Sequence, residues 1–388
     1  MTTATKDAST TKLSDSDLAS GAPNRAPARP AATGSKPVTL VGLDLGTNAS
    51  CVLAGPTNST DISLSKIIPT VVGYPKEGIV DGIITGNAGI VFGEAAIQHM
   101  LHLNLIAPLE QGIISHREAA RDFLGELRSL IDPHHKSELR VVIGVPANAS
   151  EEAREDIRQT VTGLFDRVLL IPEPFLAALG FRDDSRIGQA GYTDPVTNSL
   201  FVDIGGGTTD LCLVQGYFPT ADDQISLPFA GDAVDQLLAS EIARTYPHTG
   251  ISQHKVRSIK EAHAYAGESR GAINVPVIVG GKTRDLELGA ALGKAGNALV
   301  DQVFEAMKKL IGRASSDSVE ILLQNIIVTG GGSQLKGIDT VLQARLEAEG
   351  YASPKVRLAG RDFKRYVALG ALKAARAARE NQWQYLLA

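Results

Sequence analysis

Short runs of apolar residues, each closed by an aspartate or by glycines, recur at wide intervals along the chain. Residues 38–44, 200–203 and 324–329 are three such runs, and their length and β-branched content predict buried β-strands. Between them lie segments in which apolar residues recur with helical spacing. Strands that alternate with helices are typical of α/β proteins, so the pattern predicts an α/β fold.

Two of the helical segments can be placed in more detail. Ser150 is expected to cap a helix that begins with Glu151 and Glu152, because carboxylates suit the positive end of a helix. The apolar face of this helix is predicted to contain Ile157, Val161, Leu164 and Phe165. A second helix is predicted after residues 330–333, with an apolar face made of Leu335, Ile338, Val341, Leu342 and Leu346.

Length and composition indicate the broad class of protein. The 388 residues are more than one ordinary core supports and predict two domains. Residues 1–36 are rich in Ala, Ser, Thr and Pro, so we expect a disordered tail. No segment resembles a transmembrane helix or a signal peptide. Cys51 and Cys212 lie in apolar runs, which favours buried thiols in a reducing cytoplasm. The net charge of −5 without a basic block argues against a nucleic-acid surface.

Two glycine turns, one in each half of the chain, share one plan. Asp44 ends an apolar run and is followed by Leu-Gly-Thr. Asp203 also ends an apolar run and is followed by Ile-Gly-Gly-Gly-Thr-Thr. In both cases a second apolar run containing a cysteine comes next. The repetition predicts the same hairpin used once in each half.

The residue types in these hairpins suit a phosphate clamp. A tight glycine turn exposes successive backbone N–H groups, which form a concave anion site that a Cβ atom would block. Thr47, Thr208 and Thr209 add hydroxyl donors. Asp44 and Asp203 can hold a hydrated Mg²⁺, which prefers a few carboxylates, waters and phosphate oxygens. A single hairpin of this kind is more often an ordinary β-turn, but a matched pair favours the clamp.

A third glycine run, at residues 330–332, follows a predicted strand and precedes a helix. A simple strand-to-helix loop needs only one glycine, whereas three in a row suit a flat part of a ligand lying against the backbone. By contrast, "GGKT" at residues 280–283 resembles only the end of a Walker A loop, since Pro276 stands where the first glycine of that motif belongs. We predict a β-hairpin there.

The order of these motifs resembles the superfamily of actins, DnaK-type chaperones and sugar kinases, and within it the bacterial actins of the MreB and MamK type. The likeness covers about residues 38–375. The stretches that carry it are Asp44-x-Gly-Thr, "VVGYPKE" (71–77), "VVIGVPANAS" (141–150), "IPEPFLAALGF" (171–181), the turn after Asp203, "IKEAHAYAG" (259–267) and Gly330-Gly331-Gly332-Ser333.

This resemblance implies an actin-like ATPase fold, in which two similar α/β domains close over a nucleotide and each carries a small inserted subdomain. The first domain would span residues 37–181, with its insert at about 66–112. The second would span residues 182–388, with its insert at about 236–290. The last helix, at about 362–380, would pack back on the first domain.

The resemblance also implies roles for single residues. Asp44 and Asp203 match the two metal-linked aspartates of the family, which makes Asp203 a candidate catalytic residue as well. Glu173 matches the glutamate that orients the attacking water, although a carboxylate at a helix entry is the alternative reading. The residues that match nucleotide contacts are Gly46, Thr47, Asn48, Gly205, Gly206, Gly207, Thr208, Thr209, Gly231, Asp232, Lys260, Gly331, Gly332 and Ser333.

The chain departs from the family pattern at two places. Ala230 replaces the first glycine of the turn that contains Gly231 and Asp232, which weakens the expected contact there. Lys260 matches a lysine near the ribose, but MreB has an acidic residue where this chain has Arg257. A lysine that is merely solvated on its helix is the alternative reading for Lys260.

The resemblance implies an ATP-binding and ATP-hydrolysing protein that uses Mg²⁺ and polymerises with itself in the cytoplasm. A membrane-proximal location, partners that bind membranes or regulate filaments, and the choice between ATP and GTP are left open, as is the choice between cell shape and organelle positioning. A sugar-type kinase of the same superfamily is the main alternative. A chaperone ATPase is less favoured, because only 56 residues follow Gly332.

Overall fold

The structure is a computed structural model that describes residues 36–80, 82–84, 89–268 and 271–386. The tail predicted for residues 1–36 lies, except for Lys36, outside the described residues. All the elements below belong to the unit that spans residues 36–388.

The first apolar run forms the centre of a six-stranded sheet. Strand β1 pairs antiparallel with β2 across the turn after Asp44, and it pairs parallel with β9 on its other side. In spatial order the strands are β18 (Gln384–Tyr385), β10 (Arg167–Pro172), β9 (Glu138–Val145), β1 (Val38–Asp44), β2 (Ala49–Pro56) and β3 (Leu64–Pro69).

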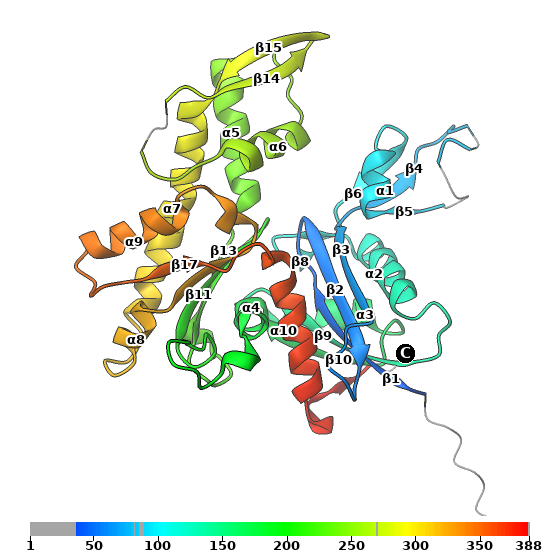
Figure 1. Cartoon of the computed structure of the whole chain (residues 1–388). Helices are drawn as coiled ribbons and strands as arrows, with labels where there is room; N and C mark the ends of the chain where they lie inside the picture. Colours follow the sequence, from blue (N-terminus) through cyan, green and yellow to red (C-terminus); the bar gives the residue numbers. More distant parts are fainter. Residues whose placement is uncertain (1–35, 81, 85–88, 269–270, 387–388) are drawn as a thin grey trace, which may run out of the picture. The chain divides into compact units, whose positions relative to one another are not determined.

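The apolar run before Asp203 forms the centre of a second sheet with the same local plan (Figure 1). Strand β11 pairs antiparallel with β12 across the glycine turn and parallel with β16 on its other side. In spatial order the strands are β13 (Gln224–Leu227), β12 (Thr209–Val214), β11 (Ser199–Ile204), β16 (Ile326–Thr329) and β17 (Val356–Leu358). Each aspartate-headed turn therefore leaves the carboxyl end of a central strand.

Helices α4 (Glu173–Phe181) and α10 (Phe363–Ala377) lie between the two sheets (Figure 1). They share one apolar core with Leu40 and Cys51 of the first sheet and with Phe201 and Cys212 of the second. Both cysteines are free and buried, as the sequence predicts. The two helices cross closely: a Cβ atom on Gly370 would lie 1.8 Å from the backbone oxygen of Leu176 in α4.

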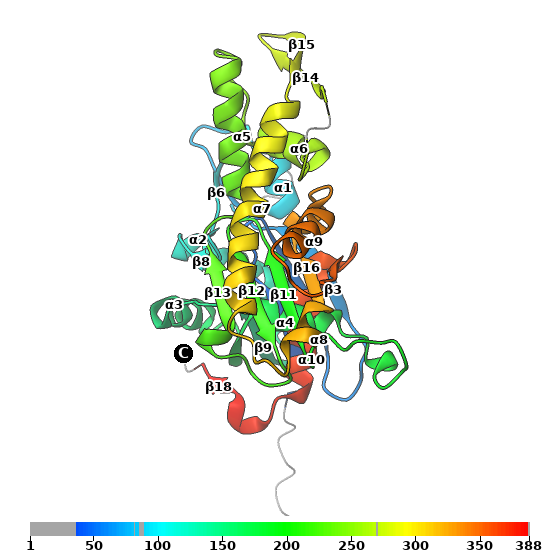
Figure 2. The same cartoon turned by 90° about the vertical axis from the view of Figure 1, so that its left-hand side faces the viewer.

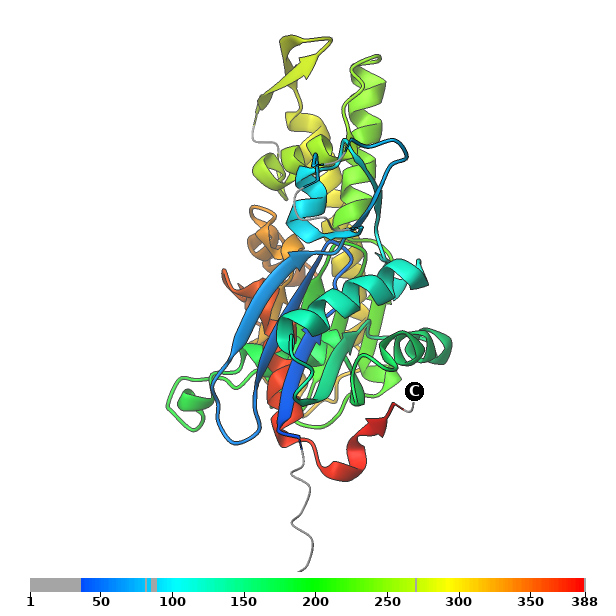
Figure 3. The ribbon, with the colours of Figure 1, turned by 90° about the vertical axis from the view of Figure 1, so that its right-hand side faces the viewer.

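The outer faces of the sheets are covered by other helices. Helices α2 (Arg117–Ile131) and α3 (Glu151–Val161) share a core with β1 and β9, and Figure 3 shows α2 in front of the first sheet. Helices α7 (Gly289–Ile311) and α9 (Ile338–Ala348) share a core with β11 and β12, and Figure 2 shows both in front of the second sheet. Helix α8 (Val319–Leu323) precedes β16.

Each half also carries smaller elements. In the first half they are β4 (Val72–Pro75), β5 (Val91–Phe92), α1 (Gly93–Gln98), β6 (Leu103–Ile106), β7 (Leu109–Glu110) and β8 (Ile113–Ile114). In the second half they are α5 (Gly231–Thr245), α6 (Gln253–His263), β14 (Asn274–Val279) and β15 (Lys282–Glu287). The resemblance places the first insert at about residues 66–112, but residues 66–69 belong to β3 of the main sheet, so the smaller elements begin at β4.

Three local predictions can be compared with the structure. The hairpin predicted at residues 280–283 is confirmed: Gly280 and Gly281 turn between β14 and β15 with φ of 57° and 77°. Ser150 caps α3 by accepting a hydrogen bond from the N–H of Ala153. The predicted apolar face of α3 was too long, because the helix ends at Val161.

The reason for the early end of α3 is local backbone geometry. Gly163 has a φ of 79°, which a continuing right-handed helix does not allow. Leu164 and Phe165 therefore follow the helix, and Phe165 is nevertheless buried in the same core. Helix α9 likewise begins at Ile338, after Gly337 with a φ of 84°, so Leu335 precedes it. Within the described ranges, no helix is both long and apolar enough to cross a membrane.

Candidate functional site

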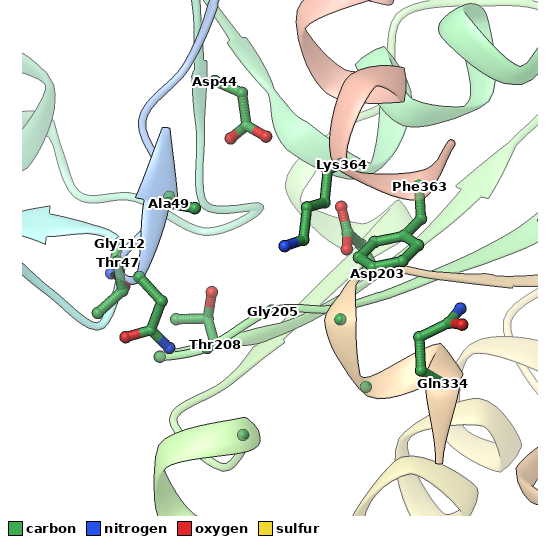
Figure 4. Close-up of a pocket in the computed structure, with 18 of the residues that line it drawn as sticks. Asp44, Thr47, Ala49, Gly112, Asp203, Gly205, Thr208, Gln334, Phe363 and Lys364 are labelled. Atoms are coloured by element: carbon green, nitrogen blue, oxygen red, sulfur yellow. Dashed lines mark hydrogen bonds between the residues drawn. The ribbon is translucent and has the colours of Figure 1, made fainter. Parts of the chain in front are cut away.

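A cavity of about 440 Å³ lies where the two aspartate-headed turns face each other. Figure 4 shows Asp44 and Asp203 entering this region from two different strands, with Thr47 and Thr208 nearby. The predicted site residues that line the cavity are Asp44, Gly46, Thr47, Asn48, Glu173, Asp203, Gly205, Gly206, Gly207, Thr208, Gly231, Lys260, Gly331 and Gly332. The fold thus brings together residues that are up to 288 positions apart, from 44 to 332.

Glu173 reaches the cavity because a glycine makes room for it. It is the first residue of α4 and follows Pro172 at the end of β10. On the neighbouring strand, a Cβ atom on Gly144 would lie 2.9 Å from the Cγ atom of Glu173. A larger residue at position 144 would push the glutamate out of place.

The carboxyl groups around the cavity repel one another and are poorly solvated. Burial raises the pKa of Asp44 to about 7. Burial, with the nearby carboxylates of Asp44 and Asp210, raises the pKa of Asp203 to about 8. Burial, with the carboxylates of Asp44, Asp210 and Asp203, also raises the pKa of Glu173 well above its ordinary value. Such a site favours a ligand that brings positive charge.

These pKa values predict how stability depends on pH in the ligand-free chain. Between about pH 4 and pH 8 the folded chain keeps protons on Asp44 and Asp203 that the unfolded chain releases. Stability therefore falls as pH rises, by up to about 1.4 kcal/mol per pH unit for each titrating carboxyl group. Chemical denaturation at pH 5.5 and at pH 8 measures the difference. Asp203→Asn should lose less stability between these two pH values than wild type does. An equal or larger loss of stability in that variant would contradict the raised pKa of Asp203.

The two turns touch each other through side chains of the first and glycines of the second. A Cβ atom on Gly206 would lie 2.1 Å from Nδ2 of Asn48. A Cβ atom on Gly207 would lie 2.6 Å from Oγ1 of Thr47 and 2.7 Å from the Cα atom of Gln111. Thr47 also accepts a hydrogen bond of 3.1 Å from the N–H of Gly112. This close approach of the first turn therefore requires glycine at positions 206 and 207, whether or not a ligand is bound.

Several backbone donors at the cavity have no acceptor of their own. Within the described part of the chain, the N–H groups of Thr47, Asn48, Gly206 and Gly207 donate no hydrogen bond. By contrast, the N–H of Gly205 is occupied by the carbonyl of Thr208 at 2.8 Å. Free N–H groups from two facing turns form the kind of concave donor set that binds anions such as phosphate.

The third glycine run has a structural reason that the sequence did not reveal. Gly330 has a φ of 78°, and a Cβ atom on it would lie 2.3 Å from a carboxylate oxygen of Asp203. A Cβ atom on Gly332 would lie 2.1 Å from Cγ2 of Ile204. Only Gly331 has open space around its Cα atom. Two of the three glycines thus fit the loop against β11, and one leaves room toward the cavity.

Three predicted site residues do not line the cavity. The hydroxyl of Thr209 donates to the backbone oxygen of Phe229 at 2.8 Å, because Thr209 is the first residue of β12 and points away from the turn. Ser333 is buried and donates to the backbone oxygen of Gly330 at 2.7 Å. Asp232 instead binds two side chains, Asn48 and Arg257.

The start of α5 is tied to the second turn. The N–H groups of Gly231 and Asp232 donate to the carbonyls of Gly205 and Gly206, at 3.2 and 2.8 Å. These two donors are therefore not directed at a ligand, unlike the expectation for this helix start. Lys260 of α6 lines the cavity, but its ammonium group also donates to the Gly231 carbonyl at 2.9 Å.

The structure also places residues at or near the cavity that the sequence did not predict as site residues, among them Asp210, Gly112, Phe363 and Lys364. Asp210 is buried opposite Asp203 in the β11–β12 pair and accepts a hydrogen bond of 2.9 Å from the N–H of Ala147. Gly112 lies beside Thr47, while Phe363 and Lys364 enter from α10, where Figure 4 shows the Lys364 side chain pointing into the cavity. Only Asp210 carried a signal, since it ends the motif "DIGGGTTD".

The residues present fit a divalent ion held together with phosphate, rather than a site built from protein ligands alone. Among the described residues no group of three or more His, Cys, Asp or Glu side chains is placed to hold a metal. Asp44 and Asp203 nevertheless lack a cationic partner there and repel each other. Mg²⁺ is usually held by one or two carboxylates plus waters and substrate phosphates. The carboxylates of Asp44 and Asp203 are ligands of this kind.

Two α/β halves with matching aspartate-headed turns, a shared helical layer and a cavity between the turns define the actin-like fold class. The family model described as "MreB/Mbl protein" matches residues 39–380. The chain belongs to the MreB/Mbl family, and both the resemblance and the fold class predicted from the sequence are confirmed.

Sequence similarity to individual proteins agrees with this family assignment. The chain is 28% identical over 318 residues to the actin-like protein MamK of Magnetospirillum gryphiswaldense, covering 81% of this chain and 83% of the relative. It is 27% identical over 252 residues to the cell shape-determining protein MreB of Escherichia coli, covering 61% of this chain and 68% of that one.

Solved structures match as well. The structure of the MamK double helical filament matches with a TM-score of 0.78 at 26% identity, covering 88% of this chain and 99% of that one. A non-polymerising MamK mutant bound to AMPPNP matches with a TM-score of 0.62 at 27% identity and the same coverage.

Proposed function

We propose that this chain is an actin-like ATPase that binds ATP with Mg²⁺ between its two turns and polymerises with itself into filaments. The observation that carries the proposal is the pair of facing turns with unoccupied backbone donors, each headed by a carboxylate with a raised pKa. Support comes from the MamK structure that holds AMPPNP, an ATP analogue, and from the MamK filament.

The chain's own groups account for binding of the triphosphate. The N–H groups of Thr47 and Asn48 on one side, and of Gly206 and Gly207 on the other, would bind phosphate oxygens. Asp44 and Asp203 would hold Mg²⁺, which supplies positive charge to the phosphates when bound. The cavity lining also includes the apolar side chains of Ala264, Leu299 and Leu335, which would pack against the base.

The proposed hydrolytic step assigns Glu173 to the water. Its carboxylate would accept a hydrogen bond from the attacking water and orient it toward the terminal phosphate. Its raised pKa indicates that in the ligand-free chain the group holds a proton, and the positive charge of a bound Mg²⁺ nearby would favour its release. Asp210, opposite Asp203 in the β11–β12 pair, accepts a hydrogen bond from the N–H of Ala147 in the segment after β9, which would hold the second turn against the first half.

We propose polymerisation because the relatives of this chain include MamK, which has been solved as a double helical filament. Further copies of the chain would then be its main binding partner. Organelle positioning is favoured over cell shape, because the match to MamK covers more of the chain than the match to MreB. Buried free cysteines suit assembly in the cytoplasm.

The test is a sedimentation and light-scattering assay of the purified full chain with Mg²⁺ and ATP, ADP or no nucleotide. We expect pelletable polymer with ATP, and release of phosphate that accompanies or follows its growth. A chain that stays monomeric with ATP at every concentration, or that phosphorylates a sugar instead, would contradict the proposal. Replacing ATP by GTP in the same assay determines the nucleotide preference.

A further inference from the structure

A chain of polar contacts beside the cavity joins the first half to the second. Nδ2 of Asn48, in the turn after β1, donates to Oδ1 of Asp232 in the first turn of α5, at 3.0 Å. The same Oδ1 atom accepts from a terminal nitrogen of Arg257 in α6, also at 3.0 Å. We call these three residues the clasp.

The second half holds its end of the clasp rigidly. Nε of Arg257 donates to Asp235, one helical turn after Asp232, at 3.2 Å. Lys260 lies 2.9 Å from the other carboxylate oxygen of Asp235. Two cations of α6 thus balance two carboxylates of α5, and the Asp232 carboxylate is fixed facing Asn48.

The first half is equally constrained at Asn48. The backbone oxygen of Asn48 accepts a hydrogen bond from the N–H of Thr70 at 3.1 Å, and the Thr70 hydroxyl donates to the Gly46 carbonyl at 2.7 Å. The Asn48 side chain also fills the space that Gly206 leaves open in the second turn. Movement of one turn away from the other must therefore break the contact between Asn48 and Asp232.

The clasp also gives a reason for Arg257, which stands where the resemblance expects an acidic residue. A glutamate at this position would place a third carboxylate beside Asp232 and Asp235. Arginine instead donates to both, because its planar group with several donors can bind two acceptors at once. The Arg257 and Asp232 side chains are 40% and 30% exposed, so the contact lies at the rim, outside the cavity lining.

We propose that Asn48, Asp232 and Arg257 are positioning residues that keep the two turns together and slow the release of bound nucleotide. This inference rests on the proposed function, since it assumes that a nucleotide binds between the turns. Arg257 acts through Asp232, and Asp232 acts through Asn48. Loss of any member of the clasp should therefore speed nucleotide release without abolishing binding.

The experiment measures the dissociation rate of a fluorescent ATP analogue from the full chain with Mg²⁺, below the concentration at which polymer forms, after a chase with excess ATP. We expect Arg257→Ala and Asp232→Ala each to speed release about tenfold, and the double variant to be no faster than the faster single one. Arg257→Lys should restore part of the effect. The matched control is Arg244→Ala, which removes an exposed arginine from α5 whose ion pair, among the described residues, is with Glu241.

The outcomes separate the two proposals. If the wild-type chain binds no analogue, the proposed function fails. If it binds but both single variants release at the wild-type rate, the clasp is wrong and the proposed function stands. If Asn48→Ala speeds release while Arg257→Ala and Asp232→Ala do not, Asn48 acts on the phosphates directly, which also overturns the clasp.

Discussion

Replacing Glu173 by glutamine is expected to lower the rate of ATP hydrolysis by about a hundredfold to ten-thousandfold, while nucleotide binding persists. The carboxylate is the one group at the cavity placed by the proposal to accept a hydrogen bond from water, and general-base groups contribute rate factors of this size. Glutamine keeps the shape of the side chain beside Gly144 and removes the charge. Single-turnover phosphate release measures the effect.

The fold of the Glu173→Gln variant should not suffer. Because burial and three neighbouring carboxylates already disfavour the charged form of Glu173, an uncharged glutamine adds no repulsion in the ligand-free chain. A control variant is Glu347→Gln on the exposed side of α9. Hydrolysis within a few fold of wild type in Glu173→Gln would remove Glu173 from the catalytic role. Filaments that form with ATP but persist longer would agree with it.

The second large effect is expected for Asp44→Asn and Asp203→Asn. Each variant should weaken the binding of ATP in the presence of Mg²⁺ by roughly tenfold to a hundredfold, because a charged ligand of the ion is lost. Without Mg²⁺ the same variants should bind ATP at least as well as wild type, since two carboxylates that repel phosphate are reduced to one. Titration of nucleotide with and without Mg²⁺ measures both.

The opposite effects on ATP affinity with and without Mg²⁺ distinguish a residue that holds the metal ion from one that only maintains the structure. A variant that merely disturbed the turn would lose affinity under both conditions. Equal losses with and without Mg²⁺ would therefore contradict the assignment of Asp44 and Asp203 to the ion. Asp210→Asn serves as a comparison, because Asp210 is a buried carboxyl group of β12 that does not line the cavity.

The turns could be predicted from the sequence because their signals are local. Asp44 and Asp203 each end an apolar run and precede glycine, and the repetition is visible within a few residues of each. The two strand pairs and the burial of both cysteines follow from the same runs. The resemblance then extended these local signals to the whole fold, which the family match confirms.

Other features depend on residues that are distant in the sequence. Lys364 and Gly112 reach the cavity only because α10 and the β7–β8 segment pack there. Gly144 makes room for Glu173 from a different strand. The function of Gly330 and Gly332 in fitting the loop against β11 requires knowing which strand lies beside it. None of these neighbours can be identified from periodicity or from the spacing of motifs.

One error could have been avoided from the sequence alone. Thr208 and Thr209 are adjacent, and Thr209 opens the strand β12, in which successive side chains point to opposite faces. Only one of two adjacent threonines at a strand start can face the cavity, and the structure gives that position to Thr208. A similar reading of Gly163 as a helix end would have shortened the predicted helix at residues 151–165.

The central claim is that one nucleotide with Mg²⁺ binds between the two aspartate-headed turns. The most direct test is a calorimetric titration of the purified chain, below the concentration at which it assembles, with an ATP analogue that is not hydrolysed and with Mg²⁺ present. We predict one binding site per chain, lost or strongly weakened in Asp44→Asn/Asp203→Asn. The absence of binding to wild type, or undiminished binding to that double variant, would contradict the account.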